Sequence, residues 1–172
     1  MHLNDNGSKQ AKKAAGYLHD NEQIEAIYCS DLSRTRETAE AVADVTGLKI
    51  NYDFRLREAS FGLWEGMTFS EVYKKNRNEF DEWYRDVWNY KIPEGENFLA
   101  VVERVWQAIE EIASRHDGTV LIVTHGGVVR ALMSTIDPSL DIWKIPVESA
   151  SMTYFEWKYG NYCLLNANYV VE

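Results

Sequence analysis

The chain has 172 residues, 45% of them hydrophobic, with 18 Lys and Arg against 27 Asp and Glu and a formal net charge of −9. Its length and apolar content exclude a disordered chain, and two Cys in a chain of this length exclude a disulfide scaffold. The acidic balance argues against a nucleic-acid partner. The sequence contains no run of 18 or more apolar residues, the length that a membrane-spanning helix needs. We expect one cytoplasmic domain over residues 1–172.

Helices and short strands alternate in the first half of the chain. Apolar residues at helical spacing predict a helix over residues 8–19. A β-prone run predicts a strand over residues 24–29, followed by a helix over residues 33–46 that stops at Gly47. After a second strand over residues 48–52 and an irregular stretch, a capping box at residues 68–71 opens a helix toward Tyr84.

The second half continues the alternation and ends in a hairpin. Helices are predicted over residues 97–115 and 128–136, on either side of an apolar strand at residues 119–124. Such a continuous apolar strand is typical of one buried on both faces of a parallel sheet. Two further strands, residues 150–157 and 162–167, form a β-hairpin whose turn spans residues 158–161. These elements predict a three-layer α/β/α domain with a mostly parallel sheet, helices on both faces and a C-terminal antiparallel hairpin.

Three loops follow predicted strands, where ligands of open α/β sheets bind. The loop after the first strand opens a helix and carries Arg34 and Arg36, which suit an anion. The alternative is a helix capped by Ser30, Asp31 or Ser33, with a surface Arg paired to Glu37, and spacing alone does not separate the two.

The other two loops carry a carboxylate and an imidazole. Glu58 stands among aromatic residues, where a raised pKa would make it a proton donor, although Phe61 and Trp64 could equally belong to a structural loop. His125 ends the buried strand and precedes Gly126 and Gly127, which allow the backbone to approach a ligand. A lone His is more often structural, but this position is favourable for function.

A cation, a carboxylate and an imidazole at one crevice suit phosphoryl transfer, in which a protein neutralises phosphoryl oxygens and protonates the leaving oxygen. No His, Cys or carboxylate cluster has the spacing of a metal site, and no nucleotide-binding glycine motif or serine-hydrolase elbow occurs. We therefore expect no metal and no cofactor, and a small phosphorylated metabolite as the partner.

Three segments together resemble the histidine phosphatase superfamily, which includes the cofactor-dependent phosphoglycerate mutases: residues 30–39 (SDLSRTRETA), 57–66 (REASFGLWEG) and 123–130 (VTHGGVVR). The resemblance implies a phosphoglycerate mutase-like fold. It implies that Arg34 grips the phosphoryl group and that Glu58 is the general acid. It also implies that His125, with the adjacent Gly126, contacts the phosphoryl oxygens.

One family motif is missing. Family members begin with a strand that ends in Arg-His-Gly, whose His becomes phosphohistidine, and this sequence contains no Arg-His-Gly. We expect that on the order of 25 to 30 residues with that strand are absent. The chain as given would then be inactive. A mis-assigned gene start, a non-catalytic phosphate binder and a strand supplied by a partner remain alternatives. Exposed sheet edges would leave a gap or pair with a second copy.

The insertion at residues 53–97 is where the family varies with substrate. Its aromatic residues could pack on the core or form a lid over an organic phosphate, and Trp83, Trp88 and Tyr90 are the candidate lid residues. The segment resembles the α-ribazole-5′-phosphate phosphatases of cobalamin assembly and the broad-specificity phosphatases of the family. The short insertion favours a phosphomonoesterase over a mutase.

Overall fold

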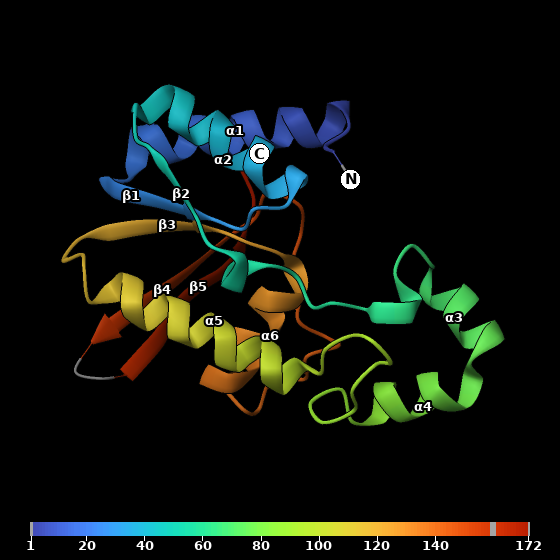
Figure 1. Cartoon of the computed structure of the whole chain (residues 1–172). Coiled ribbons are helices and arrows are strands. Elements are labelled where there is room, and N and C mark those ends of the chain that lie inside the picture. Colours follow the sequence, from blue (N-terminus) through green and yellow to red (C-terminus); the bar gives the residue numbers. More distant parts are fainter. Residues whose placement is uncertain (1, 159–160, 172) are drawn as a thin grey trace.

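Three parallel strands form the main sheet of the chain, in the order β2-β1-β3 (Figure 1). The computed structural model describes residues 2–158 and 161–171. The strands span Ile24–Cys29 (β1), Ile50–Tyr52 (β2) and Thr119–Val123 (β3). All three therefore end at the same edge of the sheet, and β2 begins two residues later than predicted.

Helices cover both faces of this sheet, as predicted (Figure 1). Helices α1 and α2 lie on one face, and α5 and α6 lie on the other. They span Asp5–Asn21 (α1), Ser33–Thr46 (α2), Phe98–Ala113 (α5) and Gly126–Ile136 (α6). No helix in the described ranges is long and apolar enough to span a membrane.

Side-chain caps fix the ends of these helices. Asn4 is the N-cap of α1 and accepts a hydrogen bond from the Gly7 N–H. The helix therefore begins three residues before the predicted boundary, which was placed from the spacing of the buried alanines and not from the cap. Gly47 ends α2 at φ 72°, as predicted, and Asn97 caps α5 through the Ala100 N–H.

The hairpin forms a second sheet of its own. Strands β4 (Met152–Lys158) and β5 (Asn161–Tyr169) pair antiparallel, which confirms the predicted hairpin. Its predicted turn includes Tyr159 and Gly160, which lie outside the described residues. Within the described chain neither strand pairs with β3, so the predicted gap between sheet edges is present.

This separation corrects one expectation about β3. The strand was expected to be buried on both faces, yet Thr119 is exposed and the side chains from Val120 to Val123 are only half-buried. The physical reason is its place in the sheet: among the described strands, β3 pairs with β1 alone and its outer edge has no neighbour. An edge strand keeps more of its side-chain surface in solvent than a central one.

The helix predicted from the capping box toward Tyr84 is divided in two. The capping box at Thr68 and Glu71 is present and starts α3 (Phe69–Lys75), but α4 (Arg77–Arg85) follows as a separate helix. Asn76 lies between them at φ −135°, ψ 55°, outside the helical region. Its backbone carbonyl starts α4 by accepting the Phe80 N–H.

Candidate active site

Ser30 and His125 meet because they follow two paired strands. Strand β1 ends at Cys29 and β3 ends at Val123, and these two residues are partners in the sheet. The Ser30 N–H donates to the Val123 carbonyl at 3.0 Å, which extends the pairing by one residue. The Ser30 Oγ then lies 2.8 Å from His125 Nε2, and both side chains are buried. The structure thus places His125 at the predicted carboxyl edge.

His125 is held as a neutral imidazole. Its side chain stands at the N-cap of α6 and is only 6% exposed. Burial, followed by the positive charges of Arg34 and Arg104, lowers the pKa of His125 from 6.5 to about 3. Near neutral pH this imidazole can therefore donate one hydrogen bond and accept another, but it carries no charge.

Glu58 lies between the short 3₁₀ helices η1 (Phe54–Leu56) and η2 (Gly62–Trp64). Its Oε1 accepts the Ala59 N–H at 3.0 Å, and its Oε2 accepts the Gly127 N–H at 3.1 Å. Burial raises the pKa of Glu58, while the two N–H donors and the charges of Arg34 and Arg104 oppose that rise. A carboxyl in this environment can hold a proton and release it, as the aromatic context predicts.

The second glycine of the His-Gly-Gly turn provides the space for this carboxyl. A Cβ on Gly127 would lie 2.5 Å from Glu58 Oε1, so any side chain there would displace the acid. A Cβ on Gly126 would make only ordinary contacts, the nearest at 3.6 Å to Arg130 Nη1. Sequence reasoning singled out Gly126 for phosphate binding and missed the contact of Gly127 with Glu58.

Arg34 lies in the first turn of α2. Its positive charge lowers the pKa of both Glu58 and His125. The structural alternative for this loop is wrong. Leu32 occupies the N-cap without a side-chain hydrogen bond. Two acids of this region are engaged elsewhere: Asp31 pairs with Arg57, and Glu37 contacts His2 rather than a surface Arg.

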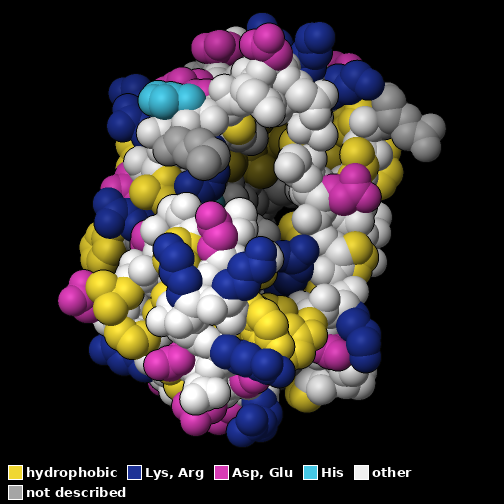
Figure 2. Space-filling model, turned by 90° about the vertical axis from the view of Figure 1, so that its right-hand side faces the viewer, with side chains coloured by type: hydrophobic (Ala, Val, Ile, Leu, Met, Phe, Trp, Pro, Cys, Tyr) yellow, Lys and Arg dark blue, Asp and Glu magenta, His cyan; other side chains and the backbone are white. Residues whose placement is uncertain are grey.

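The side of the molecule toward which β1 and β3 end is hollowed and carries both cationic and acidic side chains (Figure 2). The carboxyl ends of β1 and β3 point to the right of Figure 1, and Figure 2 shows that side of the molecule. Lys and Arg side chains gather beside a hollow on this face, although the whole chain has a net charge of −9. Two helices, α2 and α6, also begin at this edge, and helix N-termini favour anions. The arrangement suits a phosphoryl group.

The candidate lid residues differ in their exposure. Trp83 is 1% exposed and packs edge-on against Trp64 and Trp143, with ring centroids 5.7 and 4.9 Å apart. This packing corresponds to the core alternative for Trp83. Trp88 and Tyr90 are half-buried against the same core, so part of each ring remains accessible.

Metal ligands do not gather in the part of the chain that the structure describes. No group of three or more His, Cys, Asp or Glu side chains in residues 2–158 and 161–171 could hold a metal ion.

Comparison with known proteins identifies the family. Residues 1–169 match the histidine phosphatase superfamily (branch 1). The chain belongs to this superfamily. This confirms the resemblance drawn from the three motifs. It also confirms the prediction that the chain belongs to a family of enzymes, because histidine phosphatases are hydrolases.

Individual histidine phosphatases are similar over most of this chain. Phosphoserine phosphatase 1 of Hydrogenobacter thermophilus is 31% identical over 170 residues, which are 96% of this chain and 80% of that protein. The metal-independent phosphoserine phosphatase of Arabidopsis thaliana is 31% identical over 155 residues, which are 88% of this chain and 65% of that protein.

Solved structures of histidine phosphatases confirm the phosphoglycerate mutase-like fold. YhfR of Bacillus stearothermophilus is 33% identical and superposes with a TM-score of 0.88, covering 98% of this chain and 85% of that one. The alpha-ribazole phosphatase of Shigella flexneri is 25% identical with a TM-score of 0.80, over 98% of this chain and 85% of that one.

Proposed function

We propose that the site formed by Arg34, Glu58 and His125 binds the phosphoryl group of a small phosphomonoester, and that it serves hydrolysis only where the Arg-His-Gly histidine of the family is also present. One observation supports this most: at the edge where β1 and β3 end, the buried His125 bonds Ser30, and Glu58 accepts the N–H of Gly127, two residues after His125. An ester phosphate needs these three groups, because its oxygens carry negative charge and its leaving oxygen needs a proton.

Each residue has a distinct role in this proposal. Arg34 binds the phosphoryl oxygens, His125 donates to one of them from its neutral ring, and Gly126 offers its backbone at the start of α6. In a histidine phosphatase that carries the Arg-His-Gly motif, the histidine of that motif takes the phosphoryl group as the O–P bond breaks, and the acid at the position of Glu58 gives its proton to the leaving oxygen. The resulting carboxylate then accepts a proton from the water that attacks the phosphorylated intermediate.

Whether this chain can form the phosphorylated intermediate depends on the nucleophile of the family. Histidine phosphatases use the His of Arg-His-Gly, and this sequence contains no such tripeptide. We therefore propose that the 172-residue polypeptide by itself binds phosphate but does not form phosphohistidine. A phosphate-binding pseudoenzyme is the corresponding alternative, and phosphoglycerate mutase-type transfer is a second.

Two substrate classes follow from the relatives. The similarity to phosphoserine phosphatases covers 96% of this chain in one case and favours phosphoserine. The similarity to an alpha-ribazole phosphatase structure favours an α-ribazole 5′-phosphate with a large organic group. In the second case the insertion at residues 53–97 would act as a lid, with the accessible parts of Trp88 and Tyr90 against the organic group.

Binding of inorganic phosphate, measured by titration calorimetry, tests the site. Replacement Arg34→Ala should weaken binding at least about tenfold, because a charge-assisted hydrogen bond contributes roughly 1.5–3 kcal/mol. Arg36→Ala is the matched control. It removes the same charge from the same helix, but the Arg36 guanidinium lies 5.0 Å over the Tyr52 ring. Equal affinity in wild type and Arg34→Ala would reject the proposed site.

Turnover tests the chemistry. Purified protein whose mass matches this sequence should not hydrolyse p-nitrophenyl phosphate, phosphoserine or α-ribazole 5′-phosphate, and should not interconvert phosphoglycerates. Robust turnover of any of these would overturn the proposal that this polypeptide forms no phosphohistidine, and the substrate turned over would identify the class.

A further inference from the structure

The loop that carries Glu58 is held by a side chain from a distant helix. Arg104 projects from α5 and donates from Nη1 to the carbonyls of Arg55 and Arg57, at 2.6 and 2.8 Å. Its Nη2 donates to the carbonyl of Glu58 itself, at 3.1 Å. One guanidinium therefore fixes three backbone carbonyls in a four-residue segment that ends at the acid.

Glu96 completes the attachment on the far side of Glu58. Its Oε1 accepts from Arg104 Nε at 2.9 Å, and its Oε2 accepts from Arg104 Nη2 at 3.0 Å and from the Ser60 N–H at 2.9 Å. The Glu96 N–H also donates to the Ser60 carbonyl at 2.9 Å. Residues on both sides of Glu58 are thus tied to one ion pair, and the Arg104 and Glu96 side chains are 18% and 28% exposed.

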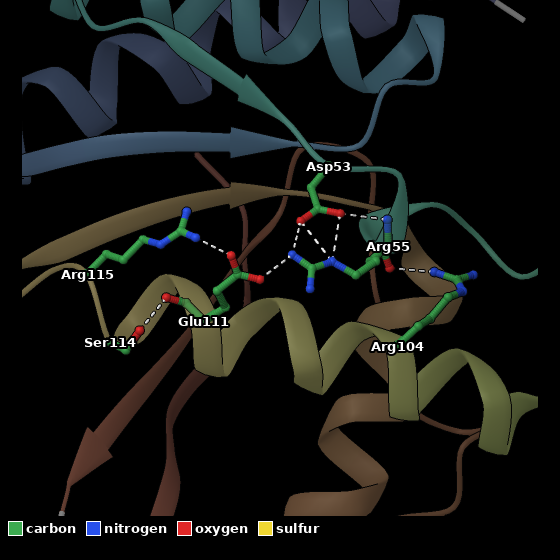
Figure 3. Close-up of polar contacts among 6 residues, drawn as sticks. All are labelled: Asp53, Arg55, Arg104, Glu111, Ser114 and Arg115. Carbon is green, nitrogen blue, oxygen red and sulfur yellow. Dashed lines mark hydrogen bonds and ion pairs between the residues drawn. The ribbon is translucent and has the colours of Figure 1, made fainter.

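The start of the loop is anchored to the same helix. Figure 3 shows Arg55 between Asp53 and Glu111, with its backbone carbonyl turned toward Arg104. Arg55 Nη2 donates to Asp53 Oδ2 at 2.6 Å and to Glu111 Oε2 at 2.8 Å. Both Glu111 and Arg104 belong to α5. The loop therefore has little freedom to shift along or away from α5.

We propose that Arg104 and Glu96 are positioning residues that hold the Glu58 carboxyl against the Gly127 N–H. The inference rests on the proposed function for its chemical meaning, because it assigns Glu58 the role of acid. Arg104 bonds to the backbone of the loop rather than to the carboxyl, so it acts by setting where that carboxyl stands. The planar fork of donors is essential, since a Lys ammonium in its place offers one point charge.

The test uses Arg104→Lys, which keeps the positive charge and removes the fork. The titration of Glu58 is followed by ¹³C NMR of the side-chain carboxyls, with its signal assigned by its loss in Glu58→Gln. The exchange rate of the Gly127 amide is measured in the same samples. Gly127 lies on α6, which Arg104 does not bond in the described structure, so its amide reports the position of the carboxyl.

In Arg104→Lys, the pKa of Glu58 should change from its wild-type value, because the released carboxyl loses the Gly127 N–H, which lowers this pKa, and loses burial, which raises it. The Gly127 amide should exchange at least about tenfold faster, since it loses a hydrogen bond to a charged group. Phosphate affinity should stay within about threefold of wild type, because Arg34 and His125 are not replaced. Arg115→Lys is the matched control. Arg115 follows the end of α5 and pairs with Glu111, and in the described structure it bonds no carbonyl of the loop.

An unchanged Glu58 titration together with an unchanged Gly127 exchange rate would overturn the positioning role. If Arg104→Lys does not fold, Glu96→Gln replaces it, because Gln keeps the shape and loses the ion pair, and the same two readouts decide. The proposed function fails separately, when phosphate binding does not depend on Arg34. Neither NMR readout requires turnover.

Discussion

The pKa values of Glu58 and His125 are shifted in opposite directions for the same reason. Burial disfavours the charged form of each group, which raises the pKa of the acid and lowers that of the base. For Glu58 the folded pKa is raised, so its contribution to stability is present below 4.5 and is lost as pH rises through the folded value. For His125 the folded pKa is lowered, so between pH 6.5 and about 3 this side chain is protonated in the unfolded chain and neutral in the native chain. The native state therefore becomes less stable as pH falls from 6.5 toward about 3.

Replacement His125→Gln should remove one part of this acid sensitivity. Between pH 6 and pH 4 the wild-type free energy of unfolding should fall more steeply than that of the variant, by about 1.4 kcal/mol per pH unit for one proton. Urea unfolding at several pH values measures the slopes. His19→Gln, at the exposed end of α1, is measured beside it as the variant that removes an exposed histidine. Equal slopes for wild type and His125→Gln would contradict the buried neutral imidazole.

The three motifs predict Arg34, Glu58 and His125 as site residues, because each follows a strand end or a turn that is visible as a local pattern, and the structure brings the Glu58 carboxyl to the turn after His125. Arg104 and Glu96 give no such signal. Arg104 is one polar residue of an amphipathic helix, and three of its hydrogen bonds go to backbone carbonyls almost fifty residues away. Only the folded chain shows that a guanidinium faces that loop.

At the scale of elements, two loops of the insertion meet backbone to backbone. The Leu63 N–H donates to the Pro93 carbonyl at 3.0 Å. Gly62 makes this approach possible, because a Cβ there would lie 2.1 Å from that carbonyl oxygen. Gly95 meets Ser60 in the same way, with 2.5 Å from a built Cβ to the carbonyl oxygen. The end of the insertion, around Pro93 and Gly95, is therefore held against the loop that follows Glu58 by backbone contacts that leave no room for a side chain.

Replacement Gly62→Ala should destabilise the protein by more than about 3 kcal/mol, through left-handed backbone strain and overlap with Pro93. Gly66→Ala is the matched control: its φ of 77° is also left-handed, but a Cβ there has open space. It should cost only the strain, about 1–2 kcal/mol. Urea unfolding followed by Trp fluorescence compares the two variants, and equal losses would show that the close contact contributes nothing.

Element boundaries show where local patterns stop being informative. Strand β1 and helix α2 have the predicted limits, because a β-prone run and a terminal glycine define them locally. The helix expected to run past Asn76 does not, since hydrophobic periodicity continues through a residue whose backbone leaves the helical region. The edge position of β3 could not be predicted, because strand neighbours are set by tertiary packing.

At the scale of the whole molecule, the described part of the hairpin is attached to the rest of the chain by side-chain packing, including Met152 and Phe155 on the two apolar clusters of the core, rather than by sheet hydrogen bonds. Tyr17 of α1 packs against Tyr169 with centroids 5.0 Å apart, and Trp106 of α5 packs against Tyr162 at 4.3 Å. Within the described residues β4 and β5 form their own sheet. The hairpin can therefore open without breaking the pairing of β1 with β3.

Hydrogen exchange should detect this independence. Amides of the Phe155–Leu164 pair should exchange at a lower opening free energy than those of Ile27 in β1. Replacement Trp106→Leu should speed hairpin exchange roughly two- to tenfold while leaving Ile27 unchanged, because one aromatic pair contributes about 0.5–1.5 kcal/mol. Trp88→Leu is the control, as Trp88 packs on Phe98 away from the hairpin. Uniform protection across both sheets would contradict this view.

The parallel pairing of β1 with β3 also affects how the chain reaches its fold. Ile24 lies beside Thr119, so this contact closes a loop that contains every element from α2 to α5. Closing so long a loop costs chain entropy before the strands gain any contact, and such topologies fold slowly. During synthesis α1, β1, α2 and β2 leave the ribosome well before β3 does. Residues of the apolar cluster around Ile27, Ala39 and Val42 are therefore synthesised before Leu121 and Val123 of β3, which pack against them in the folded chain.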